Sequence, residues 1–331
     1  MTEQFDITII GGGPAGMFAA FYAGMNNAKT QVIESLAELG GQVNALYPEK
    51  TILDVAGLPA VSGRDLIANQ QKQNAQFPLT VKTGETVTNV TAMEDGFTIT
   101  TPAGTSQSKA VIVAIGNGAF APRKLNVATA DDLTGKHLFY SVRDLERFRD
   151  KVVMVAGGGD AAIDQALMLE PVAKSVTLLH RRAQFRGLPH MVDLLQQSSV
   201  HVQTPYLIRD LAETPAGLDV TLKPVGQAGD PVHTTVDDLI VSYGFTSDHS
   251  ALAKWDVQLA ESQRLIAVDS TMATSVDGIY AIGDGVMYPG KQPLIATGYG
   301  EAPVAVRSIM TRFFPDHHGP VHSTSLDSKL L

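Results

Sequence analysis

Cysteine is absent from the 331 residues of the chain. This absence excludes disulfides, thiolate metal sites, iron–sulfur clusters bound by the chain, a cysteine nucleophile and any CxxC dithiol. Long apolar runs are missing too: none approaches the roughly 18 residues that a membrane helix needs, so we expect no membrane protein. Positive charge is in deficit, because 25 Lys and Arg stand against 34 Asp and Glu. The net charge of −9 argues against bulk nucleic-acid binding.

The sequence also lacks the common motifs of nucleophilic and metal-assisted hydrolysis. It contains neither GxSxG nor HExxH. We therefore expect no catalytic acid or base and no metal site. The length predicts two domains, and 44% hydrophobic with 18% charged residues is typical of a globular protein. The first residues run into a strand pattern without a basic leader, which predicts a cytoplasmic protein.

Two segments of the chain resemble each other. Each has a short β-branched run (6–10 and 151–156), then a glycine turn, then the pattern of an amphipathic helix. In such a turn the glycines allow a tight bend and a close approach to a pyrophosphate, and the helix N-terminus offers unpaired N–H groups. The residues expected at the two pyrophosphates are Gly11, Gly13, Ala15 and Gly16 in the first copy and Gly157, Gly158, Gly159, Asp160 and Ala161 in the second. One copy alone would fit a plain strand–turn–helix, but two copies in the same context favour dinucleotide binding.

The two copies differ where such a unit reads its ribose, about 20 residues after the turn. Glu34 stands at this place in the first copy, and His180-Arg181-Arg182 stands there in the second. A carboxylate accepts hydrogen bonds from ribose hydroxyls, whereas arginines bind a 2′-phosphate through charge-assisted pairs. The first site should therefore take FAD or NAD and the second NADP, with Arg186 as a third cation.

Two buried-strand runs bracket the second copy: 110–115 before Gly116 and 238–243 before Gly244. This layout predicts a discontinuous first domain, 1–117 and 246–331, with a second domain, 118–245, inserted into it. The two crossovers then lie close together and form a hinge. We also expect a hairpin of 85–92 and 97–101, and a helix after Gly300 with Pro303 in its first turn.

Further motifs give the chain a family resemblance. They are Gly40-Gly41-Gln42, Ala45 to Lys50, Gly278 to Asp284, Tyr288 to Lys291, Ala296 to Pro303 and His322 to Ser325. With these motifs the chain resembles the thioredoxin-reductase-like flavoproteins, and among them the ferredoxin–NADP reductases of that type. The resemblance implies an α/β fold with two Rossmann-like domains of the three-layer ββα type. FAD would lie in the discontinuous domain and NADPH in the inserted one.

The resemblance also implies roles for single residues. Those expected at FAD are Glu34 on the ribose, Gln42 at the flavin, Tyr47 stacked on one flavin face, Val87 at the adenine through its backbone, Phe120 lining the flavin site, Asp284 on the ribityl chain, His322 on the other flavin face and Ser325 near it. The tail contacts would come from the same chain or from the second chain of a homodimer. The helix after Gly300 would point its positive end at the flavin and stabilise a reduced, anionic ring.

The absence of cysteine restricts the possible electron acceptors. Thioredoxin and disulfide reductases pass electrons through cysteines, and this chain has none. The resemblance implies hydride transfer from NADPH to flavin N5, then single-electron transfer to ferredoxin or flavodoxin. The basic candidates for docking such an acidic carrier are Lys50, Arg123, Lys124, Lys291 and Arg307. Two other functions stay open: an NADPH diaphorase or oxidase that reduces quinones, free flavins or ferric chelates, and a flavin-bound redox sensor that does not turn over.

Overall fold

The computed structural model describes residues 3–226 and 229–316, and contacts divide the chain into two compact units. Unit 1 comprises the described residues up to Ala45, Thr51–Ala119 and those from Ser247 onward. Unit 2 comprises Leu46–Lys50 and Phe120–Thr246. The short segment Leu46–Lys50 is counted with unit 2, which the sequence did not suggest. Within the described residues, no helix has both the length and the apolar character needed to cross a membrane.

Unit 1 is built on a seven-stranded sheet in the order β5-β2-β1-β8-β7-β6, with β21 also paired to β8. Its strands are β1 (Glu3–Ile10), β2 (Thr30–Glu34), β5 (Leu79–Thr83), β6 (Asn89–Met93), β7 (Gly96–Thr101), β8 (Gly104–Val113) and β21 (Ile279–Ala281). β1, β2, β5, β8 and β21 pair in parallel, and the β6–β7–β8 meander is antiparallel. Buried β-branched side chains on both faces of β1 and β8 explain why these strands occupy the centre.

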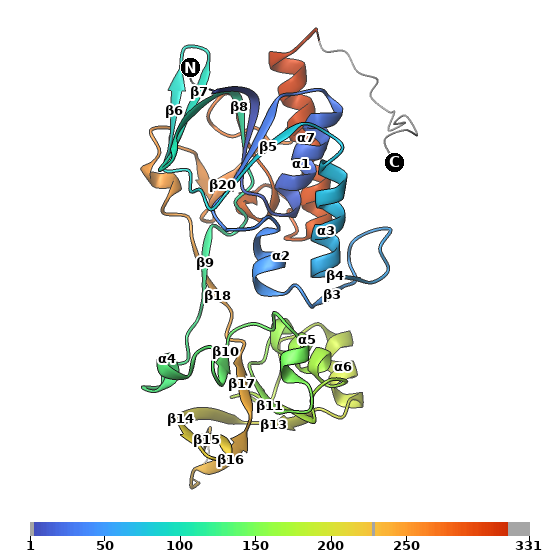
Figure 1. Ribbon diagram of the computed structural model, residues 1–331, viewed down its shortest axis with the longest axis vertical. Coiled ribbons are helices and arrows are strands. Elements are labelled where there is room, and N and C mark those ends of the chain that lie inside the picture. The colour runs from blue at the N-terminus through green and yellow to red at the C-terminus, as the bar shows by residue number, and fades with distance from the viewer. Residues whose placement is uncertain (1–2, 227–228, 317–331) are drawn as a thin grey trace. The chain divides into compact units, whose positions relative to one another are not determined.

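Three helices cover one face of this sheet: α1 (Pro14–Met25), α3 (Gly63–Asn74) and α7 (Ile295–Phe313) (Figure 1). Small side chains of α1 and α7, such as Ala19 and Ala305, pack with Ile7 and Ile112 in one core cluster. A second cluster on the other face joins Phe97 of β7 to the 252–286 segment. The remaining elements of the unit are α2 (Gly41–Leu46), β3 (Thr51–Ile52), β4 (Val61–Ser62), the 3-10 helices η2 (Leu252–Lys254) and η3 (Gly283–Gly285), β19 (Glu261–Ser262), β20 (Leu265–Ala267) and β22 (Val286–Met287).

Unit 2 repeats the layered design. Its parallel sheet has the order β10-β17-β11-β12-β13. These strands are β10 (Leu138–Phe139), β11 (Val152–Ala156), β12 (Ser175–Leu179), β13 (His201–Gln203) and β17 (Asp238–Val241). Core residues join one face to α5 (Asp160–Leu169) and α6 (Pro189–Gln197), and the other to an antiparallel sheet of β14 (Tyr206–Thr214), β15 (Gly217–Pro224) and β16 (Val232–Val236). The unit also has α4 (Ala130–Leu133) and η1 (Glu146–Phe148).

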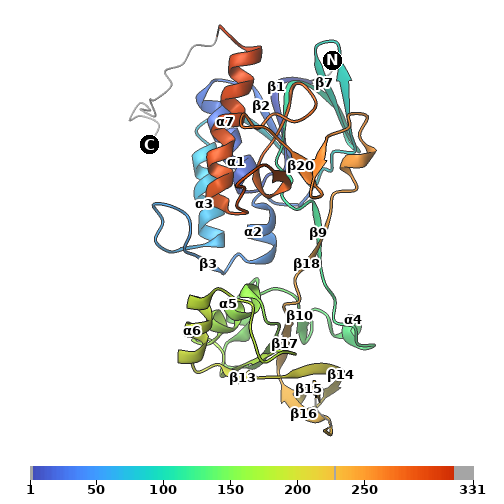
Figure 2. The same cartoon turned by 180° about the vertical axis from the view of Figure 1, so that it is seen from behind.

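The two crossover segments pair with each other as β9 (Ala119–Pro122) and β18 (Phe245–Asp248) (Figure 2). The prediction of an α/β fold with two three-layer Rossmann-like units is confirmed. Which unit holds which nucleotide stays a prediction, as does a hinge at the crossovers.

Two local expectations need correction. The helix expected after Gly300 begins at Ile295, so Pro303 lies inside it. Proline cannot donate a hydrogen bond to the carbonyl four residues earlier, yet the helix continues because Ala302, Ala305 and Val306 bury its inner face completely. The hairpin's first strand begins at Asn89 rather than at 85, because the Glu85 amide donates to the Glu34 carbonyl at 3.0 Å and holds the preceding loop against β2.

Candidate functional site

The carboxyl ends of parallel strands gather the predicted residues of unit 1 at one edge of its sheet. β1 ends before Gly11, β2 ends at Glu34, and β21 ends just before Gly283 and Asp284. β1 pairs with β2 and β8, and β21 pairs with β8, so these ends are neighbours. In open α/β sheets this edge is where ligands bind.

The first glycine turn is packed so tightly that two of its positions require glycine. Gly11 has a φ of +106°, and a Cβ there would lie 2.4 Å from the Ala114 carbonyl oxygen. A Cβ at Gly16 would lie 2.0 Å from the Gly11 carbonyl oxygen. These glycines let strand, turn and helix α1 approach one another closely, which is their role in a dinucleotide fingerprint.

Glu34 is a buried carboxylate held entirely by backbone amides and a neighbouring hydroxyl. Its Oε2 accepts from the Gly12 amide at 2.7 Å, and its Oε1 accepts from the Leu36 amide at 2.8 Å and from Ser35 Oγ. Two loops close around it: the Gly40 amide donates to the Gly12 carbonyl at 2.8 Å, and the Gly84 amide donates to the Leu36 carbonyl. The second loop leads to Val87, so the turn, Glu34 and the chain near Val87 lie together.

The helix N-termini at the two glycine turns have no side-chain cap among the described residues. The N-cap positions of α1 and α5 are Gly13 and Gly159, and neither helix has a capping side-chain hydrogen bond. Helix α3 differs, because Ser62 accepts from the Asp65 amide at 3.0 Å. The first amides of α1 and α5 are therefore free of competing side chains and suited to a phosphate. A dinucleotide thus fits both turns.

Ala15 in the first turn of α1 is the point where three elements of unit 1 meet. A Cβ at Gly283 would lie 3.3 Å from the Ala15 Cβ, and a Cβ at Gly298 of α7 would lie 3.1 Å from it. Asp284 comes directly after Gly283 in the chain and is half-buried. Burial raises the pKa of its carboxyl group above the ordinary value, with Lys291 opposing and Glu301 reinforcing the shift.

Glu301 is a buried residue of this region for which the sequence pattern predicts no role. Its Oε2 accepts from the Gly283 amide at 2.6 Å, and its Oε1 accepts from the Tyr288 hydroxyl at 2.7 Å and from Lys291 Nζ. The side chains of Lys291 and Glu301 are each only 4% exposed. Glu301 therefore fastens α7 to the turn that carries Asp284. Glu301 lies in the motif 296–303, but nothing in that motif indicates that this glutamate is buried.

The prediction that Lys291 helps to dock a carrier is wrong, because its ammonium group is buried in the pair with Glu301. Two other candidates are already paired inside unit 2. Lys50 lies 2.6 Å from the Asp164 carboxylate, and Lys124 lies 2.7 Å from Asp131. Arg123 and Arg307 are exposed. A surface that docks the carrier therefore stays a prediction, and fewer basic residues are available to form it.

The second glycine turn, in unit 2, has an imidazole where the first has a carboxylate. A Cβ at Gly158 would lie 2.2 Å from His180 Cε1, so the buried ring lies directly over the turn. Burial lowers the pKa of His180 below its ordinary value, and the charges of Arg181, Arg186 and Arg182 lower it further. The charges of the three arginines predicted to bind a 2′-phosphate therefore all disfavour the protonated form of this one buried imidazole.

The remaining residues predicted at the flavin are Gln42, Tyr47, Phe120, His322 and Ser325. Gln42 lies in α2, half-buried. Tyr47 and Phe120 belong to unit 2, where Lys50 Nζ lies 6.0 Å from the Tyr47 ring centre and Phe120 packs edge-on against Phe245. Contacts of these residues with a flavin stay predictions. His322 and Ser325 lie outside the described residues.

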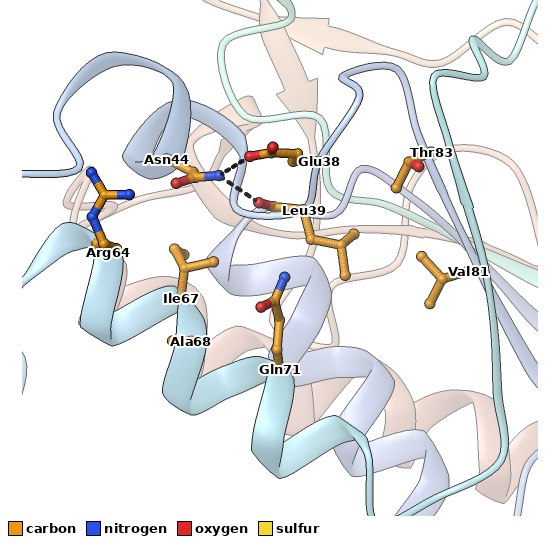
Figure 3. A pocket seen from close by; sticks show the side chains of 9 residues that line it. All are labelled: Glu38, Leu39, Asn44, Arg64, Ile67, Ala68, Gln71, Val81 and Thr83. Carbon is orange, nitrogen blue, oxygen red and sulfur yellow. Dashed lines mark hydrogen bonds between the residues drawn. The ribbon is translucent and has the colours of Figure 1, made fainter. Parts of the chain in front are cut away.

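A pocket of about 460 Å³ lies beside the Glu34 loop in unit 1 (Figure 3). The segment before α2, α2 itself, α3 and β5 supply its lining: Glu38, Leu39, Asn44, Arg64, Ile67, Ala68, Gln71, Val81 and Thr83. Asn44 donates to the Glu38 carboxylate at 3.0 Å and to the Leu39 carbonyl, which fixes one wall. Leu39 also touches the glycine turn, since a Cβ at Gly12 would lie 2.4 Å from its Cδ2.

Comparisons with known proteins agree with this architecture. Residues 5–308 match the family model of the pyridine nucleotide-disulphide oxidoreductases. The chain is 74% identical to a ferredoxin–NADP reductase of Levilactobacillus brevis over 98% of this chain and 99% of that one. It is 54% identical to a ferredoxin–NADP reductase of Lactiplantibacillus plantarum over 100% of both chains.

The fold resembles the crystal structure of T. acidophilum thioredoxin reductase, with a TM-score of 0.79 and 23% identity over 93% of this chain and 98% of that one. At that identity the likeness concerns the fold alone. The chain belongs to the pyridine nucleotide-disulphide oxidoreductases and, among them, to the ferredoxin–NADP reductases.

Proposed function

We propose that the chain is a flavoprotein that moves electrons between NADPH and ferredoxin or flavodoxin through non-covalently bound FAD. The observation that carries the proposal is the contrast between the two glycine turns. A buried carboxylate, Glu34, stands at the first, and the buried His180 ring, followed in the chain by Arg181, Arg182 and Arg186, stands at the second. The high identity to relatives named ferredoxin–NADP reductase supports the same activity.

In this proposal unit 1 binds FAD. The amides at the start of α1 bind the pyrophosphate, because no side chain of the described residues caps them. Glu34 accepts from the adenosine ribose, and the chain at Val87 meets the adenine. Asp284, placed by the turn that Glu301 holds, binds the ribityl chain.

Unit 2 binds NADPH in this proposal, with its pyrophosphate at Gly157, Gly158 and the start of α5. Arg181, Arg182 and Arg186 bind the 2′-phosphate, since guanidinium groups form bidentate, charge-assisted pairs with phosphate. A basic group in place of a carboxylate here also removes the repulsion that would exclude a 2′-phosphate.

Because α7 begins at Ile295, the positive end of its helix dipole lies earlier in the chain than the sequence predicts. The helix begins at Ile295 without a side-chain cap among the described residues, so its positive end lies around Leu294 and Ile295 rather than near Gly300. That end would stabilise negative charge on a bound cofactor. FAD would supply the conversion of a two-electron hydride transfer into single-electron steps. Since the chain has no cysteine, electrons leave it without a dithiol relay.

We also propose that the protein is a cytoplasmic homodimer and that an acidic redox carrier is its partner. Steady-state turnover with NADPH and either ferredoxin, flavodoxin, quinones, ferric chelates or oxygen tests the acceptor. The proposal expects the highest kcat/KM with ferredoxin or flavodoxin. Higher efficiency with the small acceptors would indicate a diaphorase, and no reduction of the bound flavin by NADPH would indicate a sensor. Light scattering of the purified protein tests the dimer.

A further inference from the structure

The segment 180–188, here called the basic loop, is fastened to the second glycine turn at three points. At its start, the His180 ring lies over Gly158 and stacks on Phe185 with ring centres 5.5 Å apart. In its second half, the Arg186 amide donates to the Gly158 carbonyl at 2.7 Å. At its end, the Leu188 amide donates to Asp160 Oδ1 at 2.8 Å. The basic loop is therefore tied down by the protein's own groups.

Asp160 is the one acidic member of this arrangement. It is the first residue of α5, at the helix end whose amides suit a pyrophosphate. An ionised carboxylate accepts hydrogen bonds but donates none, so it would repel phosphate oxygens rather than bind them. The sequence placed Asp160 among the nucleotide contacts, yet the structure turns its oxygen to the Leu188 amide, 28 residues later in the chain.

The bond from Leu188 also links two helix starts. Leu188 is the N-cap residue of α6 and has no side-chain cap of its own among the residues described. Asp160 satisfies its amide and thereby holds the end of the basic loop beside the start of α5. The negative charge is itself favourable in the first turn of α5, because it lies at the positive end of the helix dipole. The charge thus stabilises the protein through the helix dipole and through the Leu188 amide.

We propose that Asp160 is a positioning residue that latches the basic loop, so that Arg181, Arg182 and Arg186 are gathered before a nucleotide with a 2′-phosphate arrives. This inference rests on the proposed NADPH site and adds a determinant of its specificity. A latch raises affinity by keeping most molecules in the binding-competent shape, since apparent affinity falls with the competent fraction. Its loss should affect only ligands that use the arginines.

The test compares two ligands that differ by the 2′-phosphate alone: adenosine 2′,5′-bisphosphate and adenosine 5′-monophosphate. Their binding to the full-length FAD-loaded protein is measured by calorimetry. Asp160→Ala should weaken the bisphosphate roughly tenfold and the monophosphate less than about twofold, in keeping with the loss of one hydrogen bond to a charged group. Asp160→Asn keeps an acceptor oxygen for the Leu188 amide and should retain bisphosphate affinity. Asp193→Ala removes an exposed carboxylate of α6 and is the matched control.

Hydrogen exchange at the Leu188 amide gives a readout that does not depend on nucleotide. Exchange should accelerate in Asp160→Ala and remain slow in Asp160→Asn. Equal weakening of both ligands by Asp160→Ala would overturn the latch, because the loss would then not depend on the 2′-phosphate that the arginines bind. Unchanged bisphosphate binding, or an Asn variant as weak as the Ala variant, would overturn it as well. A wild-type protein that binds both ligands equally would instead refute the proposed NADPH site.

Discussion

Removing one partner of the buried ion pair in unit 1 should destabilise the protein strongly. Lys291 and Glu301 are each 4% exposed, and Glu301 also holds the Gly283 amide and the Tyr288 hydroxyl. Glu301→Gln preserves the shape and an acceptor oxygen for Gly283, but leaves the Lys291 ammonium group buried without its counter-charge. Breaking a buried pair in this way costs about 3–5 kcal/mol. For a unit of this size the melting temperature should fall by roughly 6–20 °C.

The matched variants are Lys291→Met and the double variant Lys291→Met with Glu301→Gln. The double variant has no unpaired buried charge, so it should regain most of the lost stability, with a coupling energy of about 2 kcal/mol or more. Thermal unfolding is followed by far-ultraviolet circular dichroism on the apoprotein, and the FAD content of each variant as purified is measured in parallel. Two results would refute the reasoning: single variants that melt within about 2 °C of the wild type, or a double variant whose loss equals the sum of the singles.

Three further predictions concern the arginines and two titrating groups. Arg181→Ala with Arg182→Ala should lower kcat/KM for NADPH about 30- to 150-fold, from roughly 2–3 kcal/mol of charge-assisted bonding, and barely change NADH; equal losses would contradict the phosphate role. The pKa of His180 is lowered in the folded protein, so protonation favours the unfolded chain and stability is lost as pH falls below about 6.5. NMR titration should show that this pKa rises when adenosine 2′,5′-bisphosphate binds. An unchanged pKa would contradict a phosphate bound among the arginines. Burial, and then the hydrogen bond to Glu301, raises the pKa of Tyr288 from 10.0 to about 12. The contribution of the neutral Tyr288 to stability is therefore complete below pH 10 and is lost between about pH 10 and 12. The ultraviolet titration curve of Tyr288→Phe should lack one late-ionising tyrosine, and an unchanged curve would contradict this.

The two nucleotide-binding units could be predicted from the sequence because their signals are local. A β-branched run, a glycine turn and a helical period stand next to each other at Gly11 and at Gly157, and Glu34 and His180 follow at the same spacing. The three-layer fold then follows from strands that are apolar on both faces and helices that are apolar on one. The comparisons and the structure confirm the fold, whereas the roles of Glu34 and His180 stay predictions.

Other features depend on contacts that no local pattern records. A glutamate and a lysine ten residues apart are usually solvated, and only the return of the 286–294 segment onto α7 buries Lys291 against Glu301. Pro303 suggested a helix start, since proline is common there, but the buried face of α7 carries the helix through it. The place of Asp160 in the motif predicts a nucleotide contact, and its bond to Leu188 appears only once the basic loop folds back.

Anaerobic reduction of the FAD-loaded protein by NADPH and by NADH tests the central claim most directly. The flavin absorbance is followed by stopped flow at matched, sub-saturating nucleotide concentrations, so that the rates report kcat/KM-like efficiencies. The arginines around His180 predict reduction by NADPH that is about 30- to 150-fold more efficient than reduction by NADH. Equal efficiency with the two nucleotides, or a flavin that NADPH does not reduce, would contradict the account.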